Sequence, residues 1–486
     1  MNIKSLMKDK LKFIPNIVLI ISGISLFQTV GVFEETYCKK LRVKNNVGIP
    51  GKTCEFIRKS KITFPSNFIL ENSKNLNKLI AYRSSSGNII KGNKEQTERF
   101  SSLKPNFTFN YPKGSKSDSG FLLLSTADPL KDGEPLIELW DLNAQKLIYK
   151  WEFNTNKILK EVGILRKSNS IRFLHPLLLK DGNIATTIIW GPLMKLSPMG
   201  ELVKVNNEYE FHHSLEIDSQ ENIYVPIRKK LSSIGNRGYE EGFAIVDQNL
   251  NIKKTFFLKD IYEKAGLNYQ IYAPELPIDP FHLNDVQPLL SLDNTRVVFL
   301  SLRNQSTILA FDLIDEKIIW LLQGYSSFQH DIDIIEKDGS AISIFDNNNE
   351  FTGKGLITKK NLFTIIENLP SISTNNKSEL LIFNNAGNSF IEKDLIIKQE
   401  NFSFLDNKLI PISHTNGLAE FIKNNNSIFI EETNYGRLFE YEQSTKKLLW
   451  QYININESNK NIYSTSWSRR LRVLPKDLIE KLSNIK

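Results

Sequence analysis

The sequence predicts an all-β protein, a six-bladed β-propeller that follows an N-terminal transmembrane helix. Three observations support this prediction. A short phrase recurs along the chain, strand-like runs with turn residues lie between its copies, and one long uncharged run stands near the N-terminus. A propeller is built from such repeats, and each repeat forms one four-stranded sheet beside a common axis.

The recurring phrase is an apolar strand, a polar turn and a second apolar strand that begins with lysine. Its clearest copies are Leu139–Trp151, Leu309–Trp320 and Leu438–Trp450, and weaker copies begin near residues 193, 244 and 381. The copies start roughly 50 to 70 residues apart, a period that suits propeller repeats. Six copies therefore predict six blades.

Short apolar runs that end in turn residues lie between these copies. Helical patterns are few, near residues 259–264 and 475–482. A pair of β-sandwiches would explain the strands but not the repeated turn and lysine, so the propeller is the better explanation. The strand-like runs are Gly182–Trp190, Asn222–Val225, Arg296–Leu300, Ser340–Phe345 and Ser427–Ile430.

The N-terminus has a different pattern. Met1–Lys12 contains four lysines against one aspartate, and Phe13–Phe33 then carries no charge. An apolar run of this length can span a bilayer as a helix, and its basic flank predicts a cytoplasmic N-terminus. A cleaved signal peptide is the alternative. The anchor interpretation predicts a single-pass inner-membrane protein with its propeller in the periplasm.

Two cysteines, Cys38 and Cys54, follow this run. In an oxidising compartment a lone pair usually forms a disulfide, and closing a loop of this size would stabilise the fold by about 3 kcal/mol. The expected parts of the chain are a cytoplasmic flank (1–12), an anchor or signal (13–33), a linker with an early β region (34–120), the propeller (121–467) and a C-terminal tail or helix (468–486).

The composition argues against nucleic acid as a partner. The formal net charge is +8, with lysine and asparagine spread along the whole sequence. No block of lysine or arginine is long enough to act as a nucleic-acid arm. With 41% hydrophobic residues, the chain has ample material for a large core.

Reactive side chains fall at the edges of the predicted strands. Among six histidines, the doublet His212-His213, His282 and His330 stand out, and Arg303 lies between the last two. Neutral imidazole can act as nucleophile, proton shuttle or metal ligand, and a flanking Asp or Asn is expected to fix its tautomer. Because equivalent strand ends of a propeller converge on its axis, these residues are expected to meet there.

The chain also resembles the arylsulfate sulfotransferases, bacterial enzymes that work without the nucleotide donor PAPS and are built on a six-bladed propeller. The resemblance covers most of residues 121–467, and its elements occur in the family's order. The most specific elements are His212-His213, Asp279–Val286, Ser301–Ser306 and Gln329–Asp331 followed by Gly339–Asn347.

The resemblance implies a role for each reactive residue. His330 matches the nucleophile that accepts the sulfuryl group as a sulfohistidine. His282 and Arg303 match the residues that hold the sulfate oxygens. His213 matches a further active-site histidine, although its neighbour His212 stays an alternative for that position.

The same resemblance implies the reaction and its partners. An aryl sulfate would donate the sulfuryl group to a phenol in a ping-pong reaction, with Asn284 and Arg303 binding the substrate. No metal and no cofactor are expected. A homodimer is one possible assembly, and the sequence does not decide it.

Two other classes of function remain alternatives. A propeller oxygenase would hold iron with four histidines, although the cation of Arg303 would oppose a metal, and a quinoprotein dehydrogenase would have eight blades. An anchored propeller that only binds a partner would have scattered histidines. The candidate iron ligands are His175, His213, His282 and His330, with His414 as a fifth choice.

Overall fold

The computed structural model describes residues 98–116, 119–230, 239–272, 279–289, 296–352, 355–369 and 395–485. The expected anchor at 13–33 and the expected Cys38–Cys54 disulfide lie outside these residues. Within them, no helix combines the length and the apolar character needed to cross a membrane. The chain divides into two compact units. The larger one comprises residues 86–350 together with 358–486 and contains the sheets, except for part of one hairpin, whose residues 351–357 belong to the smaller unit.

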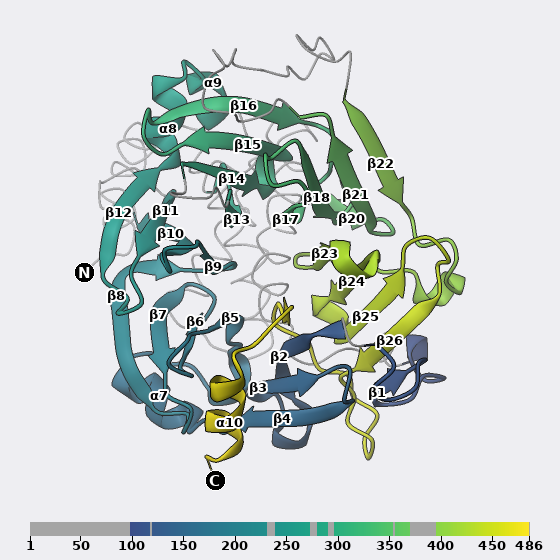
Figure 1. Ribbon diagram of the computed structural model, residues 1–486. Coiled ribbons are helices and arrows are strands. Elements are labelled where there is room, and N and C mark those ends of the chain that lie inside the picture. Colours follow the sequence, from purple (N-terminus) through teal and green to yellow (C-terminus); the bar gives the residue numbers. More distant parts are fainter. Residues whose placement is uncertain are drawn as a thin grey trace, which may run out of the picture. The chain divides into compact units, whose positions relative to one another are not determined.

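The larger unit consists of antiparallel sheets that follow one another around a common centre, as expected for a propeller (Figure 1). The first sheet is β27 (Arg469–Leu471), β2 (Phe121–Asp128), β3 (Glu134–Asp141) and β4 (Lys146–Trp151). The third is β13 (Leu283–Pro288), β14 (Val297–Leu302), β15 (Thr307–Asp312) and β16 (Lys317–Gln323). The fourth is β17 (His330–Ile334), β18 (Ala341–Asp346), β21 (Leu362–Glu367) and β22 (Ile396–Glu400).

The remaining sheets are larger or smaller than these. The fifth is β23 (Leu418–Ile422), β24 (Ser427–Glu432), β25 (Arg437–Glu442), β26 (Leu448–Ile453) and β1 (Asn106–Phe109). A hairpin of β19 (Asn349–Thr352) and β20 (Gly355–Thr358) stands apart. The second sheet has eight strands: β5 (Leu174–Leu178), β6 (Ile184–Thr187), β7 (Gly191–Leu196), β8 (Leu202–Phe211), β9 (Glu216–Ile217), β10 (Ile223–Lys230), β11 (Tyr239–Val246) and β12 (Ile252–Phe257).

The long strand β8 explains why the structure does not show six separate sheets. Its first part pairs with β7, Glu210 pairs with β10, and Phe211 pairs with both. Two neighbouring sheets are thereby joined into one that holds as many strands as two of the four-stranded sheets. The expectation of six separate sheets is therefore wrong for the described residues, which form five sheets of four or more strands.

Strands from the two ends of the described chain complete the ring. β27, near the C-terminus, pairs with β2, and β1, near the N-terminal limit of the described residues, pairs with β26. Such pairing leaves fewer sheet edges exposed. The propeller strands thus extend beyond the expected range of 121–467 at both ends.

The recurring phrase forms the hairpins β3–β4, β15–β16 and β25–β26. Just before the lysine, each turn has one residue in the left-handed region: Gln145, Glu316 or Lys446, with φ between 48° and 57°. Each hairpin also contains a register shift. A turn that ends in a left-handed residue beside a bulge is a common way to close a hairpin. This geometry explains why the phrase repeats.

The core lies between the faces of neighbouring sheets. The tryptophans that end the phrase, Trp151, Trp320 and Trp450, are buried in three different clusters of apolar side chains. Each large ring removes much apolar surface from water, which is the main force that holds one sheet against the next. The sheets therefore give the centre of the unit a fixed frame.

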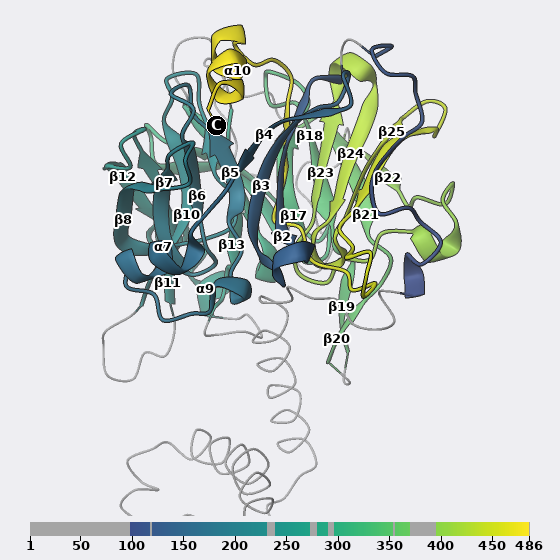
Figure 2. The same ribbon diagram turned by 90° about the horizontal axis from the view of Figure 1, so that it is seen from below.

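Short helices lie at the ends of the strands. The two expected helices are confirmed as α8 (Leu258–Lys264) and α10 (Lys476–Ser483), and α7 (Thr155–Glu161) and α9 (Asn268–Tyr272) are additional. Figure 2 shows α10 and α9 at opposite ends of the strands. Leu478 and Leu482 anchor α10 to the apolar cluster that contains Trp151.

Candidate active site

Three histidines from separate segments of the chain come together, each at or just before the start of a strand. The ring centroid of His213 lies 5.1 Å from that of His282 and 6.0 Å from that of His330. His213 precedes β9, His282 precedes β13 and His330 begins β17. These three residues are buried, and Arg303, in the turn after β14, is buried as well. The structure thus brings together the four residues that were expected to converge.

Unusual backbone conformations position these side chains. His213 and His282 have φ values of 58° and 51°, in the left-handed region that few non-glycine residues adopt. A register shift follows His330, where Asp331 has a φ of 58°. Strained residues of this kind often occur at functional sites, where the surrounding fold holds them in place.

The ring of His330 has a defined tautomer. Its Nδ1 lies 2.6 Å from Oδ1 of Asn347, whose own Nδ2 donates to the carbonyls of Ser413 (2.7 Å) and Asn416 (3.3 Å). Because Asn347 uses its amide hydrogens there, its oxygen must accept a hydrogen bond from His330. The proton therefore sits on Nδ1, and Nε2 carries the lone pair.

The electrostatic environment keeps His330 neutral. Burial, and next the positive charge of Arg303, hold the pKa of His330 well below its usual value. Among the described residues, the buried Nε2 has no hydrogen-bond partner. A neutral imidazole with an unshared electron pair on Nε2 is a competent nucleophile.

The flanking acid does not fix this tautomer, which corrects one expectation. Asp331 accepts the backbone amide of Ala419 (2.8 Å), and Asn347, which lies 17 residues further along the chain, holds His330 instead. Asn284, expected to bind substrate, donates its Nδ2 to the carbonyl of Gln329 (2.8 Å). Asn284 thus ties β13 to the residue before His330.

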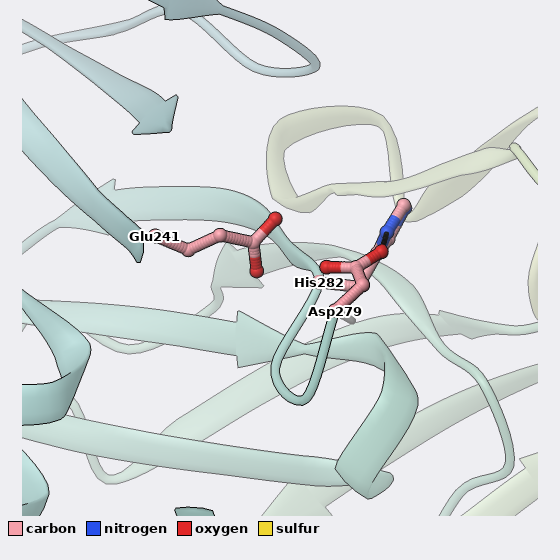
Figure 3. Close-up of side chains that lie close together, drawn as sticks. All are labelled: Glu241, Asp279 and His282. Carbon is pink, nitrogen blue, oxygen red and sulfur yellow. Dashed lines mark hydrogen bonds and ion pairs between the residues drawn. The ribbon is translucent and has the colours of Figure 1, made fainter. Parts of the chain in front are cut away.

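The carboxylate of Asp279 forms a hydrogen bond with the ring of His282. Nδ1 of His282 lies 2.7 Å from Oδ2 of Asp279, which is buried. Figure 3 shows the carboxylate of Glu241 pointing toward this pair, and Glu241 accepts the amide of Leu283 (3.2 Å). A carboxylate bonded to Nδ1 orients the ring, and when the ring is protonated its Nε2 can donate to an anion.

The same three side chains are the one group in the described residues whose ligand atoms, all within 4.8 Å, could surround a metal ion. The four-histidine iron site considered from the sequence does not form there, since its histidines do not make such a group. His175 accepts the amide of Leu215 (3.3 Å), and His414 contacts the hydroxyl of Tyr435 (2.6 Å). We interpret the group with Asp279 as a hydrogen-bonded support for His282.

The ring contacts of His212 and His213 show which of the two faces the other histidines of the site. His213 faces His282, His330 and Trp467, whereas the ring contacts recorded for His212 are Trp190 (4.4 Å) and His213. The two Nδ1 atoms of the doublet lie 2.7 Å apart. Burial first, and then the charges of His282 and Arg303, hold the pKa of His213 well below its usual value.

Arginine makes the site strongly cationic. The backbone amide of Arg303 donates to the carbonyl of His282 (3.1 Å), its guanidinium bonds Asn304 (2.9 Å) and it lies 4.8 Å from the ring centre of Phe328. Arg172 and Arg228 add positive charge near His213. A fork of guanidinium donors suits the oxygens of a tetrahedral anion.

Two tryptophans border the histidines, and the sequence alone did not identify them. The ring centroid of Trp467 lies 5.9 Å from that of His213 and 6.0 Å from that of His330. Trp190 lies 5.9 Å from His282. Trp467 is remote from the histidines in the sequence, and the pairing of β27 with β2 and the bond from its own amide to Glu431 (2.8 Å) hold it near them. Indole rings offer stacking surfaces for an aryl group.

A buried acid on β13 gives a prediction about stability. Burial, and then the charge of Glu216, raise the pKa of Asp285 to about 7. A raised pKa means that the folded state prefers the protonated acid, so its stabilising effect is complete below the unfolded value near 4 and is lost as the pH rises through 7. Asp285→Asn should therefore stabilise the protein at pH 8, by up to about 4 kcal/mol since one pKa unit is about 1.4 kcal/mol.

Urea unfolding of both proteins at pH 5 and pH 8 tests this expectation. The carbonyl of an asparagine can still accept the amide of Ile332, as the Asp285 carboxylate does (2.7 Å). The gain should be about 4 kcal/mol at pH 8 and roughly 1.5 kcal/mol at pH 5, because the unfolded acid is already ionised at pH 5 while the folded acid ionises between the two values. An equal difference at both values would show that Asp285 is ionised throughout this range.

Comparison with known proteins gives one match over a large part of the chain. The model of the family described as arylsulfotransferase (ASST) matches residues 197–455, which is more than half of the sequence and contains His212, His213, His282, Arg303 and His330. No curated protein matches the chain.

Several solved structures are weakly similar to this chain. They include a protein of unknown function from Bacteroides caccae (9% identity, 76% of this chain and 100% of that chain, TM-score 0.42). Others are the Cps50 (Swd1) β-propeller domain of Myceliophteria thermophila (8%, 74% and 99%, 0.40) and hydrazine synthase of Kuenenia stuttgartiensis (11%, 69% and 79%, 0.36).

The family match and the cationic histidine cluster agree with each other. A sulfotransferase must bind an anionic sulfuryl group, and the matched region supplies the buried histidines and Arg303 in one place. The chain belongs to the arylsulfotransferase (ASST) family and has a sulfotransferase-type function.

Proposed function

We propose that this protein transfers a sulfuryl group from an aryl sulfate to a phenol through a sulfohistidine on His330. The observation that carries this proposal is the state of the His330 ring. Its proton is held on Nδ1 by Asn347, and the lone pair of the buried Nε2 stands beside the charge of Arg303. Neither a metal nor a nucleotide is needed for this chemistry.

In the first half-reaction, Nε2 of His330 attacks sulfur and forms an N–S bond. The bond from sulfur to the aryl oxygen breaks, and its electron pair leaves on the phenolate, which takes a proton to become a phenol. Arg303 and His282 hold the equatorial oxygens, and the hydrogen bond that Nδ1 of His282 donates to Asp279 keeps His282 oriented for this task.

In the second half-reaction, a phenol replaces the first product. A histidine removes its proton, the phenol oxygen forms a bond to sulfur, and the N–S bond breaks to return the electron pair to Nε2 of His330. His213 is suited to exchange both protons, because its ring lies 6.0 Å from the ring of His330 and faces the same site. Trp190 and Trp467 would stack against the aryl group.

Purified protein incubated with a chromogenic aryl sulfate and a phenol, without nucleotide, tests this function. We expect release of the donor phenol and sulfation of the acceptor, with the parallel double-reciprocal lines of a ping-pong reaction. Failure to release a phenol from a range of aryl sulfates would contradict the proposal and favour a protein that only binds a partner.

We also propose that residues 13–33 anchor the protein in the inner membrane, with the propeller in the periplasm and Cys38 bonded to Cys54. The uncharged run and its basic flank support this topology. A reporter that is active only in the periplasm, fused after Lys44, should be active. Activity of a cytoplasm-specific reporter at that site would reverse the topology, and a mature chain that begins near Gly31 would identify a cleaved signal.

A further inference from the structure

The contact between His212 and His213 restricts where protons can sit. Their Nδ1 atoms lie 2.7 Å apart, and both residues are buried. A hydrogen bond between two ring nitrogens needs a proton on one and a lone pair on the other. One proton therefore lies between the two rings, and it can belong to either of them.

The two rings have different surroundings. His213 faces His282 and His330, whereas His212 lies against Trp190, with ring centroids 4.4 Å apart. The guanidinium of Arg228 lies 3.3 Å from the centre of the same indole ring. His213 can thus meet a reacting oxygen, and His212 lies behind it, against Trp190.

In the proposed reaction His213 must supply a proton, although its lowered pKa means that its ring binds a second proton weakly. The groups whose charges act on His213 are His282, Arg303, Arg172 and Arg228, and together with burial they oppose a second proton on its ring. The leaving phenolate nevertheless needs a proton, and the accepting phenol must lose one. A neighbouring ring that stores this proton would remove the conflict.

We propose that His212 is a positioning residue that stores the catalytic proton, so that the doublet works as a two-step relay. His213 gives its Nε2 proton to the phenolate while its Nδ1 takes the Nδ1 proton of His212. The doublet thereby changes from one net positive charge to neutral, and the accepting phenol reverses both transfers. This inference rests on the proposed sulfuryl transfer.

The variant His212→Asn separates the relay from the hydrogen bond. An asparagine amide can still bond Nδ1 of His213, but it cannot store a proton. Single-turnover release of phenol should be compared for 4-nitrophenyl sulfate, whose leaving group is stable as an anion, and phenyl sulfate, whose leaving group is not. We expect the variant to lose about 100-fold with phenyl sulfate, the lower range of general acid catalysis, and to stay close to wild type with the nitrophenyl donor.

The possible outcomes of this comparison distinguish the relay from the proposed function. An equal loss with both donors would show that His212 has a structural role only, and no loss with either would show that another group supplies the proton. Both results overturn the relay while leaving the proposed function intact. If the wild-type protein releases phenol from neither donor, the proposed function itself fails.

A second measurement needs no substitution and so does not depend on the folding of a variant. Single-turnover rates of the wild-type protein with phenyl sulfate should be recorded in mixtures of H₂O and D₂O. Two protons in motion predict a curved dependence of rate on the deuterium fraction, and the nitrophenyl donor should show little dependence. A linear plot with phenyl sulfate, which indicates one proton in motion, would contradict the relay.

Discussion

Replacing His330 with asparagine is expected to lower the rate of sulfuryl transfer by roughly 10³-fold or more, the scale seen when a covalent nucleophile is removed. The amide of asparagine can take over the donor position of Nδ1 and keep the bond to Asn347, so the change removes Nε2. This variant is preferable to alanine, because His330 is fully buried and alanine would leave a cavity. Initial rates of phenol release measure the effect.

His414→Gln serves as the matched control for this experiment. His414 bonds Tyr435, outside the group formed by His213, His282 and His330, and a glutamine amide can keep that bond. The control should retain wild-type rates, and thermal unfolding should confirm that both variants fold. Rates of His330→Asn close to wild type would show that another residue attacks sulfur.

The second large effect is expected for Arg303→Lys, which should lower kcat/KM by roughly 10²-fold to 10³-fold, the usual scale for losing one donor to a developing oxyanion. Lysine keeps the positive charge but cannot present the planar fork of donors that matches two sulfuryl oxygens. Steady-state kinetics with one aryl sulfate measure the loss. A change of less than about threefold would show that the planar fork of Arg303 is not needed for transfer.

Arg303→Met provides the complementary variant. The cation of Arg303 lowers the pKa of His330, so its removal should raise that pKa and shift the acidic limb of the rate profile to higher pH. Arg303→Lys should leave this limb in place. The two variants thus separate the charge that keeps His330 neutral from the donors that bind the sulfuryl group.

The fold class could be predicted because the repeat has a local cause. Each phrase contains a turn with one left-handed residue and a bulge, as at Gln145 and Glu316, and this geometry depends on neighbouring residues only. The union of two sheets through β8 could not be predicted, since it depends on whether Glu210 and Phe211 pair with β7, with β10 or with both.

The candidate site was predictable in part, because the predicted fold brings distant strand ends together. Histidines at equivalent strand ends converge in a propeller, so His213, His282 and His330 could be named from the sequence. Their partners could not, because the bond from His330 to Asn347 and the contact with Trp467 connect separate strands and the far end of the chain. A flanking acid such as Asp331 was a misleading signal, since the bulge turns it toward Ala419.

The central claim is that His330 carries the sulfuryl group, and trapping that group tests it most directly. Wild-type protein should be mixed with an aryl sulfate alone, quenched rapidly and digested for peptide mass spectrometry. We predict an increase of about 80 Da, the mass of one sulfuryl group in a covalent intermediate, on the peptide that contains His330 and its absence from His330→Asn. An adduct on His213 or His282, or turnover with no adduct on any peptide, would contradict the account.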